Sequence, residues 1–100
     1  MLFKTKPYSY NVKEVIGAVI WELRKEHRVS QEKLAEGIDS HQVYISEIEK
    51  GQKLPSLLVL YNIAVFFGLT LTQLVERIER RLESDGWTVD TTAGTIPPCC

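Results

Sequence analysis

The sequence predicts an all-α fold of five helices, and three observations support that fold class. Hydrophobic residues make up 44% and charged residues 25% of the 100 residues, which is typical of one soluble globular domain. N-cap residues and helix-ending glycines mark off five segments along the chain. The connections between these segments are short, which favours a helical bundle.

The charge, the hydropathy pattern and the cysteines limit the classes of protein. The net charge is −1 and the pI about 6.1, whereas a DNA-binding domain is usually more basic. No apolar run reaches the roughly 18 residues that a membrane span needs, and the N-terminus lacks the apolar region of a secretory signal. Cys99 and Cys100 are adjacent and provide no disulfide framework. These features predict a cytoplasmic protein in a reducing environment.

An N-terminal arm and a long first helix are predicted at the start of the chain. Residues 1–10 combine two lysines with three aromatic residues, and Pro7 prevents a helix there. We expect a loosely ordered arm, with a basic arm that touches DNA and a short edge strand as alternatives. Asn11 can cap a helix that runs to about His27 with one apolar face. Gly17 costs about 1 kcal/mol against Ala inside this helix, so we expect another element to pass close to it.

Two short helices joined by a tight turn come next. Ser30 is a good N-cap for a helix over residues 31–36, which Gly37 is expected to stop. Residues 39–40 form the turn, and the third helix runs from about 41 to 50 before a glycine. The inward-facing apolar positions of this pair are Leu34, Ala35, Ile38, Ile45 and Ile48.

The last two helices differ in length. Ser56 caps a fourth helix over about 57–67, which Gly68 ends, and Thr70 caps a fifth that runs to about Ser84. The fifth helix is longer than the core of four short helices needs. We therefore expect its apolar stripe to form a twofold interface with a second copy, and packing within one chain is the alternative. This predicted dimer interface consists of Leu71, Leu74, Val75, Ile78 and Leu82.

Residues 16–74 resemble the helix-turn-helix domain of the Cro and lambda-repressor-like family, also called the XRE family of transcriptional regulators. The matching pieces include SQEKLAE (30–36), YISEIEKG (44–51) and IAVFFGLTL (63–71). Their spacings agree without a gap, and the resemblance covers about three-fifths of the chain.

The resemblance implies a five-helix lambda-repressor-like DNA-binding domain at residues 11–84 with a lengthened fifth helix. The helix-turn-helix would occupy about 30–50, and the dimerisation helix about 70–84. The terminal segments are predicted to be irregular, although the tail at 85–100 can add one short strand around 87–91.

The resemblance also implies that the third helix reads DNA bases. In phage repressors a Gln at the position of Gln42 contacts N6 and N7 of adenine, which is typically worth about 1–3 kcal/mol of discrimination. We expect Val43 to be exposed and to suit a thymine methyl, with partial packing on its neighbours as the alternative. Ser46 would reach a base or a phosphate. Glu47 would accept a hydrogen bond from N4 of cytosine, or would increase sequence specificity by repelling phosphate.

Phosphate contacts are implied for a second group of residues. A Gln at the position of Gln31 bonds a phosphate oxygen in the family and often orients the next amide, and a solvent-facing Gln is the alternative. Lys50 and Lys53 suit nonspecific phosphate contacts. Tyr44 is expected to be half-buried with its hydroxyl toward backbone or phosphate. His41 would bond a phosphate if protonated, but a surface histidine is the preferred interpretation.

A structural salt bridge and two departures from the family pattern complete the comparison. Family members pair an Arg and a Glu at the positions of Arg24 and Glu49, so we predict a bond between the first and third helices rather than a base contact. Asp39 stands where the turn usually has Gly, and Asp tolerates a positive φ better than most residues. Ser40 replaces a small apolar residue, which removes some burial beneath the turn.

The leading hypothesis is a sequence-specific transcriptional regulator that binds double-stranded DNA. Residues 24–53 contain six basic and six acidic side chains, so this segment is neutral. Phosphate neutralisation supplies most nonspecific affinity, and a monomer would therefore bind weakly. A homodimer on a palindromic operator, with half-sites about one helical turn apart, would double the contacts.

Other functions are weaker on the sequence. A protein-interaction module that keeps the fold but has lost DNA binding is the alternative, supported by the neutral surface and by Glu47. An enzyme is not predicted, because His27 and His41 lack metal-ligand spacing and no nucleophile–base set is recognisable. No metal or cofactor is expected. Control would come from protein concentration, a regulatory protein partner or both, and a restriction-modification controller or an antitoxin fits the size equally well.

Overall fold

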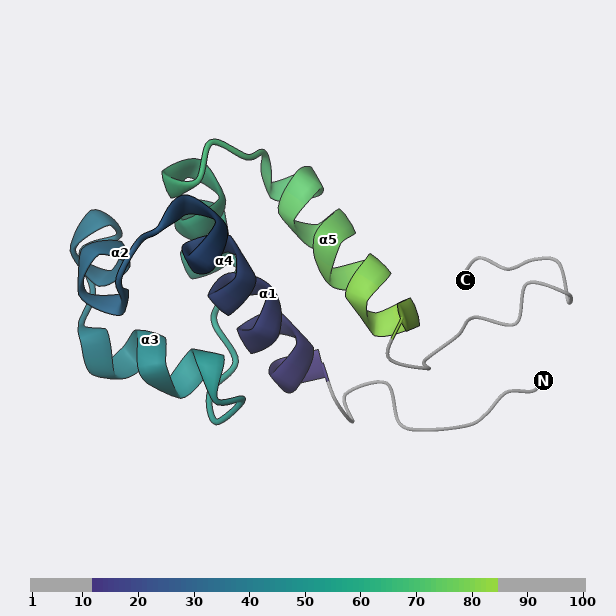
Figure 1. Cartoon of the computed structure of the whole chain (residues 1–100), viewed down its shortest axis with the longest axis horizontal. Coiled ribbons are helices and arrows are strands. Elements are labelled where there is room, and N and C mark those ends of the chain that lie inside the picture. The colour runs from purple at the N-terminus through teal and green to yellow at the C-terminus, as the bar shows by residue number, and fades with distance from the viewer. Residues whose placement is uncertain (1–11, 85–100) are drawn as a thin grey trace, which may run out of the picture.

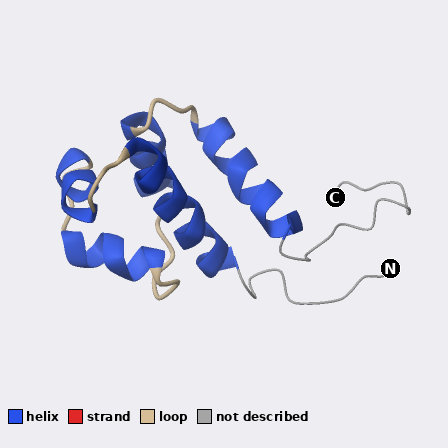
Figure 2. Cartoon of the chain, viewed as in Figure 1, coloured by secondary structure: helices blue, strands red, loops and turns tan. Residues whose placement is uncertain are grey.

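Five α-helices make up the described part of the computed structural model, residues 12–84 (Figure 1). The predicted all-α class is confirmed: residues 12–84 contain no strand, and loops and turns join the helices (Figure 2). The predicted arm, Asn11, the tail with its strand and both cysteines lie outside the described residues. The helices are α1 (Val12–His27), α2 (Gln31–Gly37), α3 (Gln42–Glu49), α4 (Leu57–Phe66) and α5 (Leu71–Ser84).

Helix α1 lies between α3 and α5 and packs against both (Figure 1). Helix α2 packs on α3 and α4, and α4 also packs on α5. The predicted inward positions of α2 and α3 lie in or against the core formed by these contacts, with only Ile38 partly exposed. All five helices contribute fully buried large side chains, which include Ile20, Leu23, Leu34, Ile45, Ile48, Ile63 and Leu74.

Local hydrogen bonds fix the helix ends. The side-chain oxygens of Ser30, Ser56 and Thr70 accept from the backbone N–H three residues later, at 3.0, 3.2 and 3.0 Å. Gly51 and Gly68 follow α3 and α4 with a φ of 76°, and the N–H of the residue after each glycine donates back to the last turn of its helix. These five predicted boundary residues are confirmed.

Two glycines are required by close approach rather than by backbone conformation. As predicted, another element passes close to Gly17: the C-terminal end of α3 lies there, and a Cβ on Gly17 would overlap the carbonyl oxygen of Ile48. The prediction that Gly37 stops α2 is wrong, because the helix includes Gly37. A Cβ on Gly37 would overlap the ring of Phe66 instead. The left-handed residue of the turn is Asp39, with a φ of 57°.

The predicted role of the α5 stripe needs correction. Leu74 is fully buried and Ile78 is 7% exposed within the core of this chain, and Leu82 packs against the same core. Leu71 is half-buried, and Val75 is 39% exposed. The stripe is apolar because α5 covers α1 and α4, so Leu74 and Ile78 cannot contact a second copy in this structure.

Charged pairs join the outer sides of α1 and α5. Arg77 Nη2 donates to Glu26 Oε2 at 2.7 Å, and Arg81 donates to Glu22. The hydrogen bond from Arg77 lowers the pKa of Glu26 below its ordinary value. These pairs involve two of the charged side chains of α5, Arg77 and Arg81.

Candidate nucleic-acid interface

The outer face of α3 is the surface on which the predicted base-reading residues lie. Ile45 and Ile48 are buried, which turns the opposite side of α3 to solvent. Gln42 is exposed and Val43 is 65% exposed, so the predicted exposure of Val43 is confirmed. Ser46 and Glu47, about one turn later, are half-buried.

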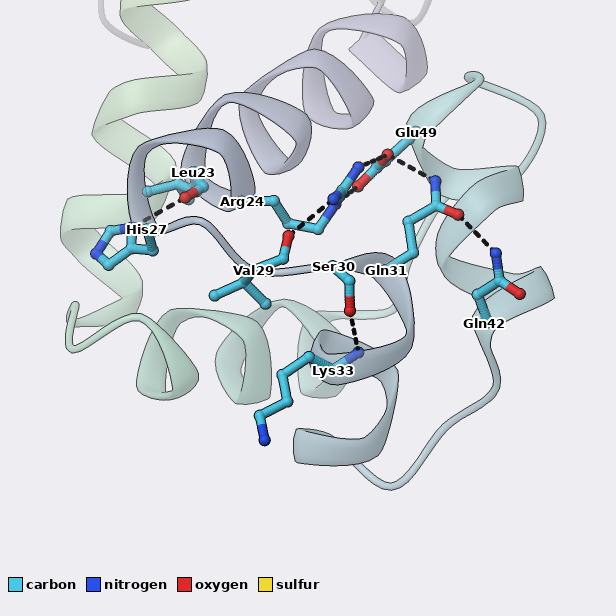
Figure 3. A network of polar contacts seen from close by, with 9 residues as sticks. All are labelled: Leu23, Arg24, His27, Val29, Ser30, Gln31, Lys33, Gln42 and Glu49. Carbon is cyan, nitrogen blue, oxygen red and sulfur yellow. Dashed lines mark hydrogen bonds and ion pairs between the residues drawn. The ribbon is translucent and has the colours of Figure 1, made fainter.

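A buried ion pair joins α1 to the C-terminal end of α3. Arg24 Nε donates to Glu49 Oε2 at 2.5 Å, and Nη2 donates to Oε1 at 2.8 Å (Figure 3). Only 7% of the Arg24 side chain and 5% of the Glu49 side chain are exposed. Arg24 Nη1 also donates to the carbonyl oxygen of Val29 at 2.9 Å, just before α2. The predicted salt bridge therefore forms, and it fixes the positions of three segments.

Two glutamines extend this pair to the surface. Gln31 Nε2 donates to Glu49 Oε1 at 2.9 Å, and Gln42 Nε2 donates to Gln31 Oε1 at 2.9 Å (Figure 3). The family resemblance implied that Gln31 orients a neighbouring amide, and the hydrogen bond from Gln42 to Gln31 has this role. The bond from Gln31 to Glu49 was not predicted, because the sequence does not show that one carboxylate meets both an Arg and a Gln. Glu49 therefore belongs to the same network as Gln42.

The charge of Glu49 sets the direction of both amides. A carboxylate only accepts hydrogen bonds, so Gln31 must turn its amide nitrogen toward Glu49. The oxygen of Gln31 then faces Gln42, and Gln42 must turn its own nitrogen toward Gln31. Figure 3 shows the oxygen of Gln42 on the side away from Gln31. The buried pair thus determines which end of the Gln42 amide is presented outward.

A second ion pair changes the expectation for Glu47. Lys53 Nζ lies 3.7 Å from Glu47 Oε1, with 56% of the Lys53 and 33% of the Glu47 side chain exposed. Lys53 was predicted to contact a phosphate and Glu47 a base, and in the structure the two residues form an exposed ion pair. The negative charge on α3 is therefore offset locally, so the case for repulsion of phosphate by Glu47 is weaker.

The other predicted phosphate residues lie around α3. Tyr44 is half-buried against the core, as predicted. Lys50 is exposed directly after α3. His41 is exposed at the N-cap of α3, and its side chain makes no capping hydrogen bond. The side chains of Lys50 and His41 are therefore accessible to a ligand on the α3 face.

Arg28 is a candidate that the sequence reasoning missed. It directly follows the last residue of α1 and has a φ of 57°, a backbone conformation that is uncommon for a non-glycine residue. With Lys25, Gln31 and Gln42 it lines a shallow open hollow between the end of α1 and the starts of α2 and α3. The available signal in the sequence was a basic residue directly before the Val29-Ser30 entry to α2.

Residues 12–84 show no sign of two other kinds of site. They form no group of three or more His, Cys, Asp or Glu side chains that could hold a metal ion. No single helix among them is long and apolar enough to cross a membrane, and only the bent pair Leu57–Phe66 and Leu71–Glu83, with 102° between its members, meets that test jointly.

The family of the chain follows from this fold and its sequence. A helix-turn-helix family model matches residues 22–74, more than half of the chain. The chain therefore belongs to the helix-turn-helix family, of the XRE-like type, and is a DNA-binding transcriptional regulator of that class. Regulators of this family are not enzymes.

Individual relatives are control proteins. The chain is 35% identical over 80 residues to the ImmF control region 10 kDa protein of Bacillus phage phi105, covering 80% of this chain and 87% of that protein. It is 38% identical over 71 residues to the control protein C.MunI of a Mycoplasma species, covering 70% and 96%. Among solved structures, the restriction-modification controller protein C.AhdI from Aeromonas hydrophila matches with a TM-score of 0.62 at 28% identity, covering 65% of this chain and 98% of that chain.

Proposed function

We propose that this regulator binds a palindromic operator as a homodimer, with α3 of each copy in the major groove. The observation that carries the proposal is the hydrogen-bonded chain from Glu49 through Gln31 to Gln42, which ends on an exposed helix. A side chain that is held in one orientation before binding loses less conformational freedom on binding. Such an arrangement suits a residue that must distinguish one base from another.

Gln42 is assigned to an adenine. Its amide nitrogen uses one N–H for Gln31 and keeps a second, and its oxygen lies on the outer side (Figure 3). This adjacent donor and acceptor match N7 and the N6 amino group of adenine in the major groove. Val43 is assigned to the methyl group of a neighbouring thymine because its side chain is largely exposed. One turn further along α3, Ser46 is assigned to a base or a phosphate, and Glu47 is assigned to the N4 amino group of a cytosine.

Phosphate contacts are assigned to both ends of α3. Arg28 and Gln31 line the hollow beside the start of α2, and Lys50 and Lys53 follow the end of α3. Since residues 24–53 carry no net charge, one copy neutralises few phosphates, and a second copy doubles that contribution. The full proposed set comprises Arg28, Gln31, His41, Tyr44, Lys50 and Lys53.

The biological setting is proposed as control of nearby genes in the cytoplasm, where operator DNA is present. Two relatives carry names that describe control proteins, and a third is titled a restriction-modification controller. These names favour the controller hypothesis over an antitoxin. The level of the protein itself would set the response, with a regulatory protein partner as a second route.

Binding-site selection from random duplexes tests the proposal. The purified chain should return two inverted half-sites centred about 10 base pairs apart. Gln42→Ala should weaken binding to that duplex about tenfold or more and relax the preference at one position of each half-site, because one bidentate contact gives about 1–3 kcal/mol. Fluorescence anisotropy measures both effects.

The matched control is Gln52→Ala, which removes an exposed glutamine from the loop after α3 and should bind like the wild type. If Gln42→Ala selects the same sequence as the wild type, base reading through Gln42 is wrong. If the wild type selects no sequence and binds no duplex at low salt, the protein-interaction module becomes the better function.

A further inference from the structure

The outer side of α4 is apolar and open to solvent. The ten residues of α4 include no charged side chain, and the helix is apolar on more than its inner side. Its outward side chains are between 51% and 67% exposed, and the residue before Pro55 is 59% exposed. We call this group the α4 apolar face, and it consists of Leu54, Leu57, Leu58, Tyr61 and Val65.

The four helical members of the α4 apolar face lie on one side of the helix. Leu57, Tyr61 and Val65 are spaced by four residues, and Leu58 precedes Tyr61 by three, which brings all four to the same side. The face also holds five of the eight exposed large hydrophobic residues in the described range 12–84. Large exposed apolar groups concentrated in this way mark interaction sites.

We propose that the α4 apolar face is the surface on which two copies of this chain meet around a twofold axis. The proposal rests on the homodimer of the proposed function and names its interface. In a twofold interface the same patch occurs on both sides, so a charge near the axis meets an identical charge. A patch without charges avoids that repulsion, and the α4 apolar face is such a patch.

The size of the face fits a second copy. A standard protein–protein interface buries roughly 800 Å² of accessible surface on each partner, and a little over half of that surface is nonpolar. The largest apolar patch on a typical monomer is about 300–600 Å², and five large side chains that are each more than half exposed form a patch of this order. The α4 apolar face can therefore supply the nonpolar centre of a dimer interface.

Its position also fits the proposed operator. The face begins at Leu54, in the loop that leads from α3 to α4, three residues after Gly51. A twofold axis at this place brings the C-terminal ends of the two α3 helices toward each other, on the same side of the dimer. Two adjacent recognition helices are what neighbouring half-sites on one face of DNA require.

Sedimentation velocity on the full chain without DNA tests the interface. At tens of micromolar the wild type should sediment at twice the chain mass of 11.4 kDa. Val65→Glu should raise the dissociation constant of the dimer at least tenfold, because two carboxylates would meet within an apolar contact. Leu58→Glu should do the same, and its place in the first turn of α4 favours an acidic residue for folding. Circular dichroism verifies that both variants remain helical.

Val75→Glu is the matched control, because it makes the same substitution at an exposed valine of α5. It should leave the dimer intact. Three results would overturn the proposal. The first is a monomeric wild type, which would also result if another segment or another protein covered the face. The second is that the Val65→Glu and Leu58→Glu variants remain dimeric, and the third is that only Val75→Glu dissociates the dimer. Gln42→Ala should not change sedimentation, so a dimer that selects no DNA sequence contradicts only the reading of DNA.

Discussion

Helix α1 is joined to its two neighbours by arginine–glutamate pairs that differ in burial. Toward α3, Arg24 and Glu49 keep only 7% and 5% of their side-chain surfaces exposed. Toward α5, 32% of the Arg77 and 51% of the Glu26 side chain remain exposed. Water and salt screen the second pair, whereas removal of one partner from the first leaves a charge without solvation.

The difference assigns separate roles to the two sides of α1. On the α3 side, the carboxylate of Glu49 also receives Gln31, so the ion pair and the orientation of Gln42 depend on each other. On the α5 side, Glu26 and Arg77 attach two helices that carry no proposed DNA contact. Equal substitutions on the two sides should therefore have unequal effects on both stability and recognition.

Glu49→Gln should produce the largest loss of stability. It leaves the guanidinium of Arg24 buried without a counter-charge, and breaking a buried pair in this way costs about 3–5 kcal/mol. Urea denaturation followed by circular dichroism measures the change in the free energy of unfolding. A loss below about 1 kcal/mol, the range of exposed pairs, would remove the contrast between the two sides.

The double substitution Arg24→Met with Glu49→Leu sharpens the same comparison. Replacing a buried pair by apolar residues of similar volume is often neutral or stabilising, so most of the lost stability should return. Gln31 would still lack its acceptor, and the preference for one base at the position read by Gln42 should weaken. Retention of full sequence preference by the double variant would show that Glu49 does not orient the amides.

Gly17→Ala should have the next largest effect, because it acts on the α3 side of α1 without changing any charge. The new Cβ would overlap the backbone oxygen of Ile48 and lie 2.7 Å from that of Glu49, and backbone atoms cannot rotate away. Overpacking of this kind typically costs about 1–3 kcal/mol. Thermal melting measures the loss.

The neighbouring Ala18→Gly substitution provides the reference for Gly17→Ala. In an unconstrained helix, Gly→Ala gains about 1 kcal/mol and Ala→Gly loses as much. Both variants should therefore melt below the wild type, although propensity alone predicts opposite signs. A gain in stability for Gly17→Ala would mean that α1 and α3 can separate at this crossing.

Local chemistry explains why the helix boundaries were predictable. Ser30, Ser56 and Thr70 bond N–H groups only three residues away, and Gly51 and Gly68 adopt a conformation that most residues avoid. Such signals need no knowledge of distant segments. The Arg24–Glu49 pair joins residues 25 positions apart, and it was predictable only through the family resemblance.

Direction of packing explains the errors. An apolar stripe on α5 looks the same whether it covers α1 or a second copy, so the sequence could not show that Leu74 and Ile78 are buried in the monomer. Gly37 is similar, because its contact with Phe66 depends on how α2 and α4 cross. The absence of charged residues from α4 was the available signal for an exposed apolar face. The sequence did not show which side of α4 faces inward, and in the structure Ile63 and Ala64 do so.

Glu26→Gln should have the smallest effect and completes the matched comparison with Glu49→Gln. The hydrogen bond from Arg77 lowers the pKa of Glu26 in the folded state, so this residue stabilises the fold above its ordinary pKa. That contribution disappears as the pH falls through the lowered pKa, and the wild type and Glu26→Gln should then unfold at the same urea concentration. At neutral pH the wild type should be slightly more stable, and added salt should reduce the difference because the pair is exposed. A difference that is large, or that grows in acid, would show that the α5 side of α1 depends on its ion pair as strongly as the α3 side does.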